Sequence, residues 1–329
     1  MFTKNFSQLS KTDVSIAGGK GASLGEMMQA GIPVPPGFVI LVEAFDKFLE
    51  YSDLNIEIAS QIKKINYKNL NSVDTASNVI RDLIHDAPLP KDLEKGFFKE
   101  FEKLKTNYVA VRSSATAEDS LVASWAGELE TYLNTTKETL LENIKKCWFS
   151  LFTQRALFYA FEKKVFTLDH QKVIRAKTCK KMVDCYPVSV AVVVQKMIQS
   201  EVSGICFTVH PVTEDKNQMV IEAGWGLGEA IVGGKITPDT YVIDKKSRAI
   251  LDKNISEQEM MIVRGDKGID EVKVPKAKQG KQKLSDSQII KLAQICLNIE
   301  KHYGKPQDIE WALEKEKIYI TQSRPITTL

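Results

Sequence analysis

The segment DIEWALEKEKIYITQSR, residues 308–324, alternates polar and apolar residues in the manner of two β-strands joined by a short turn. Because successive side chains of a strand point to opposite faces, Asp308 and Glu310 fall on one face, while Ile309 and Trp311 fall on the other. The sequence therefore predicts an antiparallel hairpin with one polar face and one apolar face.

The polar residues of this hairpin are candidates for a metal and phosphate site. If Lys315–Lys317 forms a three-residue loop, Glu310 lies opposite Gln322, and Asp308 lies opposite Arg324. Hard oxygen ligands on adjacent strands suit Mg²⁺, and a nearby arginine suits the phosphate groups that Mg²⁺ bridges. The alternative is a solvated polar face with a cross-strand ion pair, and the hairpin residues alone do not separate the two interpretations.

The rest of the chain predicts helices first and a sheet later. Ser189–Val194 is nearly all apolar and β-branched, which is typical of a strand buried on both faces. One long helix is expected from Thr139 to about Lys163. This order predicts an α+β protein with two lobes, residues 1–190 and 191–329. The later strands are expected at Gly204–Val209, Met219–Glu222, Thr240–Asp244, Met260–Val263 and Glu271–Val274, with a helix over Ser285–His302.

Composition and charge exclude several classes of protein. The 329 residues include 45 Lys and Arg against 42 Asp and Glu, and the net charge of +3 is too small to indicate a nucleic-acid or membrane partner. The sequence has no apolar run of membrane-spanning length and no signal-peptide pattern at its start, so a cytoplasmic location is expected. The five cysteines and four histidines do not show the spacing of a zinc site.

The glycine-rich segment Gly18-Gly-Lys-Gly21 is a candidate for anion binding. Glycine N–H groups can approach an anion closely, the following helix offers its positive end, and Lys20 adds a charge. An ordinary turn before a helix is the alternative. The segment lacks the glycine spacing of a Walker A loop, and the run Gly224–Glu229 lacks that of a dinucleotide-binding fingerprint.

Two further polar residues stand beside apolar strands. Arg112 is expected to end a strand and to precede the hydroxyl-rich turn Ser113–Asp119, which makes it a candidate for a phosphate contact. An ordinary surface arginine is the alternative. Gln195 ends the buried strand and needs hydrogen-bond partners, for which an adenine edge and a polar group of the core are both suitable.

Five blocks of sequence join these candidates. They are GGKGASLGEM at Gly18, GIPVPPGF at Gly31, VAVRSSATAED at Val109, the long block from VVVQKM at Val192 through SGICFTVHPVT to EAGWGLGEAIVGGKITPD, and DIEWALE with IYITQSRPIT from Asp308. In this order they resemble the N-terminal ATP-binding domain of the phosphoenolpyruvate synthase (pyruvate, water dikinase) family, with pyruvate phosphate dikinase and rifampin phosphotransferase. The blocks span almost the whole chain, so the resemblance is far more specific than any single motif.

The resemblance implies an ATP-grasp fold, in which two α+β lobes clasp the nucleotide. The lobe 1–190 would supply phosphate-binding loops, and the lobe 191–329 would supply adenine-binding and Mg-binding strands. ATP and Mg²⁺ are the implied cofactors, and the implied activity is that of a phosphotransferase. The implied catalytic residues are Lys20, Arg112 and Arg324, and the implied metal residues are Glu310, Gln322 and Asp308. The implied nucleotide-binding residues are Lys20, Arg112, Gly127, Thr131, Gln195, Glu310, Gln322 and Arg324.

The chain departs from the family pattern in three places. His210 stands in FTVHP where many relatives have an acidic residue, and Glu214 replaces a common glycine. The stretch between Lys163 and Val188 is longer and more basic than the family pattern. The family's phosphorylatable histidine and its pyruvate-binding barrel have no counterpart among the blocks of this sequence.

We therefore expect the chain to bind Mg-ATP and to pass phosphate to a histidine on a separate domain or chain, which would also carry the pyruvate-binding domain. One alternative is the nucleotide-binding part of a rifampin phosphotransferase-like kinase that acts on another small molecule. A second alternative is a non-catalytic ATP-binding module. Neither a nucleic acid nor a membrane is expected as a partner.

Overall fold

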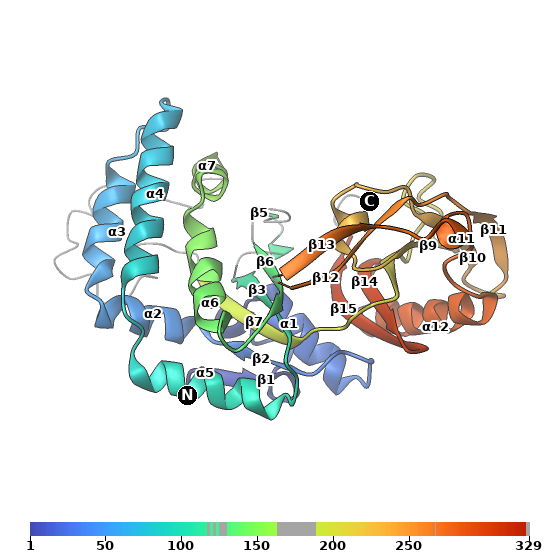
Figure 1. Cartoon of the computed structure of the whole chain (residues 1–329), viewed down its shortest axis with the longest axis horizontal. Helices are drawn as coiled ribbons and strands as arrows, with labels where there is room; N and C mark the ends of the chain where they lie inside the picture. Colours follow the sequence, from blue (N-terminus) through green and yellow to red (C-terminus); the bar gives the residue numbers. More distant parts are fainter. Residues whose placement is uncertain (117–118, 121–122, 125–129, 163–188, 267, 327–329) are drawn as a thin grey trace. The chain divides into compact units, whose positions relative to one another are not determined.

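The computed structural model describes residues 1–116, 119–120, 123–124, 130–162, 189–266 and 268–326 (Figure 1). The chain divides into two compact units. Unit 1 comprises residues 1–25 and 36–196, and unit 2 comprises residues 26–35 and 197–329. Both contain helices and antiparallel sheet, so the predicted class of a mixed helix and sheet protein is confirmed.

Unit 1 is built on a five-stranded antiparallel sheet with the order β1-β2-β7-β3-β6. One face of this sheet packs against helices and forms a large hydrophobic core, to which Val111 and Val194 contribute from the strands. Phe45, Phe48 and Trp148 stack on one another in this core. The strands are β1 (Thr3–Asn5), β2 (Gly37–Ile40), β3 (Val109–Ala115), β6 (Thr131–Thr135) and β7 (Val190–Lys196), with the short pair β4 (Asp119–Ser120) and β5 (Ala123–Ser124). The helices are η1 (Phe6–Gln8), α1 (Val14–Gln29), α2 (Val42–Tyr51), α3 (Leu54–Lys63), α4 (Leu70–Asp86), α5 (Lys91–Lys103), α6 (Leu140–Phe149), η2 (Ser150–Phe152) and α7 (Gln154–Glu162).

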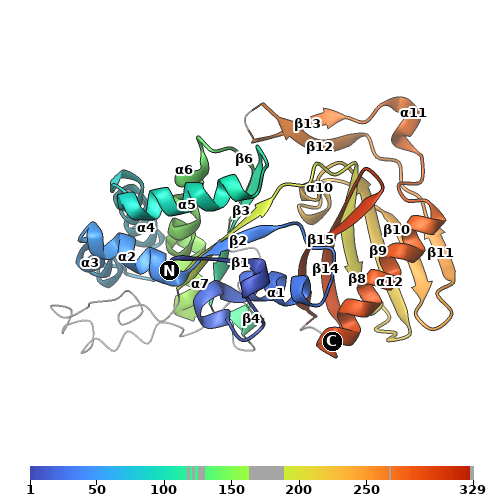
Figure 2. The ribbon, with the colours of Figure 1, turned by 90° about the horizontal axis from the view of Figure 1, so that it is seen from below.

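Unit 2 is built on a six-stranded antiparallel sheet with the order β11-β10-β9-β8-β14-β15. Helix α12 (Asp286–Tyr303) packs against β9 and β14 of this sheet (Figure 2). The helix begins at a capping box formed by Ser285 and Gln288, and it ends at Gly304, which has a left-handed φ of 67°. The strands are β8 (Val202–Phe207), β9 (Gln218–Trp225), β10 (Asp239–Asp244), β11 (Ile250–Asn254), β14 (Gln307–Glu314) and β15 (Lys317–Pro325). Unit 2 also contains the two-stranded ribbon of β12 (Met260–Gly265) and β13 (Gly268–Lys273) and the short helices α10 (Glu229–Val232) and α11 (Lys276–Gln279).

The long helix expected from Thr139 to Lys163 is wrong, because the structure breaks it into α6, a 3₁₀ turn and α7. Ser150 donates from its hydroxyl to the carbonyl of Cys147 at 2.7 Å. Thr153 has extended backbone angles, and its hydroxyl accepts from the N–H of Ala156 at 3.2 Å. Short hydroxyl side chains that bond to the local backbone therefore end one helix and begin the next.

The division between the units also differs from the expected lobes. β7 lies between β2 and β3 in the sheet of unit 1, so the division follows Lys196 and the boundary expected at residue 190 falls at the start of this strand. The segment 26–35, which includes the last turn of α1, belongs to unit 2, where the carbonyl of Pro33 accepts from the N–H of Ile320 at 2.9 Å. Within the described residues, each helix lacks either the length or the apolar composition of a bilayer span.

Candidate functional site

The C-terminal hairpin of unit 2 contains the residue pairs that the sequence predicts. β14 and β15 are antiparallel, with Glu310 opposite Gln322 and Asp308 opposite Arg324. The expected three-residue loop is wrong, because the turn consists of Lys315-Glu316, with left-handed φ values of 49° and 61°. A β-bulge after Glu310 shifts the register by one residue and so restores the predicted pairs.

Asp308 and Arg324 form a cross-strand ion pair. Nε and Nη2 of Arg324 donate to Oδ2 of Asp308, at 2.9 and 2.8 Å. The Arg324 side chain is 40% exposed, whereas that of Asp308 is 14% exposed. Both donors bind the same carboxylate oxygen, so Oδ1 of Asp308 takes no part in this ion pair. Because the Arg324 side chain is partly exposed, an anion can reach its guanidinium from solvent.

A third carboxylate, that of Glu222 on β9, lies in the same row of the sheet. Glu310 is opposite Ile205 of β8, and Ile205 is opposite Glu222. Residues paired directly across antiparallel strands share a face, so Glu222 and Glu310 project to the same side of the sheet. The other side is apolar and packs on α12, and it buries Ile309 and Trp311 almost completely. The sheet of unit 2 therefore has one acidic face.

The acidic residues of this face influence one another. Burial raises the pKa of Asp308, and although Arg324 lowers it, the charge of Glu310 raises it further, so that the pKa is above its ordinary value. The pKa of Glu222 is also raised, by burial first and then by the charge of Asp308. Half-buried carboxylates whose ionised forms are disfavoured in this way are stabilised when a cation binds beside them.

In unit 1, the glycine-rich segment is a break inside helix α1. Gly18 has φ 69° and ψ 173°, a conformation that is essentially restricted to glycine, while the flanking residues are helical. A Cβ atom at Gly18 would lie 2.2 Å from the carbonyl oxygen of Ser114. The expected turn before a helix is therefore a kink within one, and it requires glycine both for its backbone angles and for its close contact with β3.

Ser114 holds this kink against the sheet. Its hydroxyl donates to the carbonyl of Ala17 at 2.9 Å and accepts from the N–H of Gly21 at 3.1 Å, and all three groups are buried. The second bond satisfies an N–H at the start of the helical segment after the kink, as an N-cap does. β3 continues to Ala115, so the expected strand end at Arg112 is wrong, and the residues that follow it are strand rather than turn.

Three of the predicted residues lie on one face of the unit 1 sheet. Arg112 of β3 is opposite Thr131 of β6 and opposite Val193 of β7. Gln195 follows Val193 by two residues and therefore points to the same side. Ser114, two residues after Arg112, is also on this side, which is the side that the kink of α1 contacts. Gly127, which is also predicted to bind the nucleotide, lies outside the described residues.

Two of these side chains are buried although they are polar. Arg112 is 8% exposed, and Gln195 is 2% exposed. The amide nitrogen Nε2 of Gln195 has no hydrogen-bond partner within the described part of the chain. A buried amide donor without a partner costs free energy, so the position suits a ligand that accepts a hydrogen bond there.

Lys20 follows Gly18 by two residues, in the part of α1 that Ser114 of β3 holds against the sheet. Burial raises the pKa of the Cys147 thiol on α6, the charge of Glu130 raises it further, and the charge of Lys20 lowers it. Both Lys20 and Glu130 are therefore within electrostatic reach of Cys147. Glu130 directly precedes Thr131, and its carbonyl accepts from the N–H and the hydroxyl of Ser113 at 3.1 and 3.0 Å.

The loop that departs from the family pattern is a local turn. Nδ1 of His210 accepts from the N–H groups of Val212 and Thr213, each at 3.3 Å. Glu214 has a left-handed φ of 58°, which explains why glycine is the more favourable residue at this position. The basic stretch expected between Lys163 and Val188 lies outside the described residues.

The two sets of residues thus define two polar sheet faces, one basic and one acidic, each in its own unit. Comparison with known protein families matches residues 14–329 to the pyruvate phosphate dikinase AMP/ATP-binding domain. The chain therefore belongs to this family of ATP-binding domains.

Three curated relatives illustrate the match. The chain is 46% identical over 330 residues to a protein of Methanocaldococcus jannaschii named "probable phosphoenolpyruvate synthase", covering 98% of this chain and 26% of that protein. It is 39% identical over 376 residues to phosphoenolpyruvate synthase of Pyrococcus furiosus, covering 100% of this chain and 44% of that protein. It is 37% identical over 326 residues to rifampicin phosphotransferase of Bacillus subtilis, covering 98% of this chain and 35% of that protein. The chain thus spans less than half the length of each of these relatives.

Sequence reasoning did not identify Ser114 and Glu222 individually. The sequence predicts that Ser114 belongs to a hydroxyl-rich turn, and its specific contact with α1 depends on residues 93 and 97 positions away. The sequence predicts a strand that ends at Glu222, whereas β9 continues to Trp225; the sequence signal is a lone carboxylate directly after Met219-Val-Ile.

Proposed function

We propose that this chain binds Mg-ATP with the basic face of unit 1 and the acidic face of unit 2, in an ATP-grasp arrangement. The observation that supports the proposal is that Arg112, Thr131 and Gln195 share one face of the unit 1 sheet, opposite its main apolar core, and that the predicted residues of the unit 2 hairpin share one face of their sheet. Membership in a family of ATP-binding domains supports the same ligand.

The residues of unit 1 would hold the nucleotide. Lys20 and Arg112 would neutralise phosphate oxygens, and the guanidinium of Arg112 could do so with two parallel hydrogen bonds. Gln195 would contact the adenine ring, because its buried Nε2 can donate to a ring nitrogen. Thr131 is directly opposite Arg112 and would contact the same part of the nucleotide. A role for Gly127 beside them is part of the proposal.

The residues of unit 2 would hold Mg²⁺ and the terminal phosphates. Within the described chain, no three His, Cys, Asp or Glu side chains gather closely enough to hold a metal by themselves. Glu310, the amide oxygen of Gln322 and Asp308 would therefore complete the coordination with water and phosphate oxygens, which is how Mg²⁺ is usually bound. When bound, Mg²⁺ would neutralise charge on the transferred phosphates. Arg324 would contact those phosphates with the exposed part of its guanidinium.

The reaction that we propose is phosphoryl transfer of the pyruvate, water dikinase type. The chain would position ATP, and Lys20, Arg112 and Arg324 would stabilise the charge that spreads over the phosphate oxygens in the transition state. The acceptor would be a histidine on a separate domain or chain, which then delivers the phosphate to pyruvate. The relatives named as phosphoenolpyruvate synthases are more than twice as long as this chain, so they have room for such domains.

Calorimetric titration with Mg-ATP tests the nucleotide site. We expect the wild-type chain to bind, and we expect Glu310→Gln to bind at least about tenfold more weakly, because the substitution removes a charge beside the metal. Glu257→Gln is the matched control, since Glu257 is exposed and has no side-chain hydrogen bond or ion pair within the described chain. Absence of binding in the wild type, or equal binding by the two variants, would refute the proposal.

A second candidate function is phosphorylation of another small molecule, and the match to rifampicin phosphotransferase favours it. The two candidate functions are distinguished by mixing the chain with ATP, a histidine domain from each class of relative, and either pyruvate or rifampicin. The molecule that becomes phosphorylated shows which function the chain serves. Formation of phosphoenolpyruvate by the chain alone would contradict the need for a separate histidine domain. Mg-ATP binding without transfer to either histidine domain would identify a non-catalytic nucleotide-binding module.

A further inference from the structure

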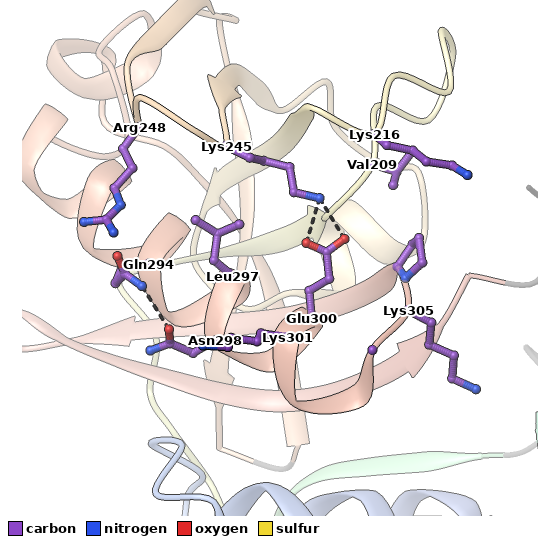
Figure 3. Close-up of a pocket in the computed structure, with 12 residues that line it drawn as sticks. Val209, Lys216, Lys245, Arg248, Gln294, Leu297, Asn298, Glu300, Lys301 and Lys305 are labelled. Carbon is purple, nitrogen blue, oxygen red and sulfur yellow. Dashed lines mark hydrogen bonds and ion pairs between the residues drawn. The ribbon is translucent and has the colours of Figure 1, made fainter.

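A polar hollow lies in unit 2, on the α12 side of its sheet (Figure 3). Its volume is about 610 Å³, and it is lined by the second half of α12, the turn between β10 and β11, and the ends of the loops after β8 and before β14. The acidic face with Glu310 is on the opposite side of the sheet, because α12 packs on the side that buries Ile309. The hollow is therefore separate from the proposed Mg-ATP site.

The lining of this hollow is strongly basic. Its described residues include one carboxylate, Glu300, and five cationic side chains. The cationic residues are Lys216, Lys245, Arg248, Lys301 and Lys305. A concave surface with an excess of one sign of charge concentrates ligands of the opposite sign.

One of the five cations neutralises the carboxylate. Nζ of Lys245 contacts Oε1 and Oε2 of Glu300 at 2.7 and 2.6 Å, and it also donates to the carbonyl of Thr208 at 2.7 Å (Figure 3). These two side chains are 15% and 18% exposed, so the pair is a fixed part of the wall. The lining therefore presents no uncompensated negative charge.

The other four cations have no such partner. Within the residues that the structure describes, the side chains of Lys216, Arg248, Lys301 and Lys305 form no ion pair and no hydrogen bond. Arg248 comes from the tight turn after β10, where its backbone N–H donates to the carbonyl of Asp244 at 2.8 Å. Four cationic side chains without a partner in the described chain thus line this hollow, and their combined positive potential favours an anion there.

The remaining lining suits a small organic anion. Nε2 of Gln294 donates to Oδ1 of Asn298 at 2.9 Å, so two amide groups lie side by side on α12. Val209 and Leu297 add apolar surface. The guanidinium of Arg248 matches the oxygens of a phosphate group better than a lysine does, because its donors form a planar fork. The volume is in the range of sites for small molecules.

We propose that this hollow binds a small phosphate-bearing ligand with at least two negative charges, at a site distinct from the nucleotide site. Arg248 and Lys301 hold the phosphate group, Lys216 and Lys305 supply further positive charge, and the two amides orient the ligand. The proposal does not depend on the proposed function, because it rests on other residues and needs no Mg²⁺.

Nuclear magnetic resonance with inorganic pyrophosphate as the probe tests this site in the full chain without divalent cations. Titration is expected to shift the side-chain amide signals of Gln294 and Asn298 and the backbone signals of the turn around Arg248. Citrate, a polyanion without phosphate, is titrated in parallel. Because the signals are specific to this hollow, binding of pyrophosphate near Lys20 or Arg112 does not affect the result.

The double variant Arg248→Gln/Lys301→Gln is expected to bind pyrophosphate at least about tenfold more weakly, as measured from the concentration dependence of these shifts. The control Lys276→Gln/Lys281→Gln removes two exposed lysines elsewhere in unit 2 and is expected to leave them unchanged. Absence of shifts in the wild type, or equal weakening by both double variants, would overturn the proposal. Equal binding of citrate and pyrophosphate would overturn the assignment to phosphate.

Discussion

The substitution Gly18→Ala tests whether the kink of α1 is held against β3 as the structure shows. At φ 69° and ψ 173°, an alanine costs about 1–3 kcal/mol in backbone strain. Its Cβ would also lie 2.2 and 2.3 Å from the carbonyl oxygen and hydroxyl of Ser114, so the two hydrogen bonds of that hydroxyl must break. Each contributes about 0.5–1.5 kcal/mol, and we therefore expect a loss of about 2–6 kcal/mol from the stability of unit 1.

Hydrogen exchange measured by mass spectrometry on peptides from β3 and β7 reports this stability for unit 1 separately from unit 2. Gly96→Ala is the matched control, because Gly96 is inside helix α5 and a Cβ there meets nothing within 4 Å. The control is expected to stabilise the unit by about 0.5–1 kcal/mol. If Gly18→Ala lowers the stability by less than about 1 kcal/mol, the strained kink and its contact with Ser114 are not as described.

Further predictions concern unit 2. Asp239 and Lys283 form a fully buried ion pair at 2.8 Å. Asp239→Asn leaves the charge of Lys283 buried and uncompensated, so urea unfolding should show a loss of stability of about 3–5 kcal/mol. A loss below about 1 kcal/mol would contradict the burial of the pair. Glu214→Gly should raise stability by about 0.5–1 kcal/mol in thermal unfolding, because it relieves a left-handed φ of 58°, and a decrease would show that this strain is absent. The pKa values of Asp308 and Glu222 are raised, so Mg-ATP affinity should fall on acidification at a pH above the ordinary carboxylate range, and calorimetry at several pH values checks this; a constant affinity would exclude their participation. The raised pKa values also make the stability of the protein without a cation depend on pH. The contribution of these two groups to folding is fully present below the ordinary carboxyl pKa, where both are protonated, and it is lost as the pH rises through their raised pKa values.

The hairpin at the end of the chain shows how far local sequence information reaches. Alternation of polar and apolar residues placed Glu310 and Asp308 on one face, and it did so because the period of a strand is a local property. The pairing with Gln322 and Arg324 was also predicted correctly, but from a loop of the wrong length. The bulge that compensates for the two-residue turn has no evident sequence signal. The ion pair and the candidate metal residues are both present, so the two interpretations of this face are compatible.

The helix expected from Thr139 to Lys163 shows the opposite case. Apolar residues at helical spacing continue through the whole segment, and the pattern therefore predicts one helix. Ser150 and Thr153 interrupt it with hydrogen bonds to the backbone. Side-chain bonds of this kind and the backbone bonds of a helix differ little in free energy. Packing of the surrounding core therefore determines which of the two forms.

By itself, the sequence determined the mixed helix and sheet class, most of the strands of unit 2, and most of the polar residues that share a face within one hairpin. These depend on interactions between residues close together in the chain, which repeat with the period of a strand or a helix. Only the tertiary structure decided that Ser114 holds the kink at Gly18 and that Glu222 lies in the row of Glu310. Those contacts join distant segments through the order of strands in a sheet, and that order is set by how the complete core packs rather than by any local pattern.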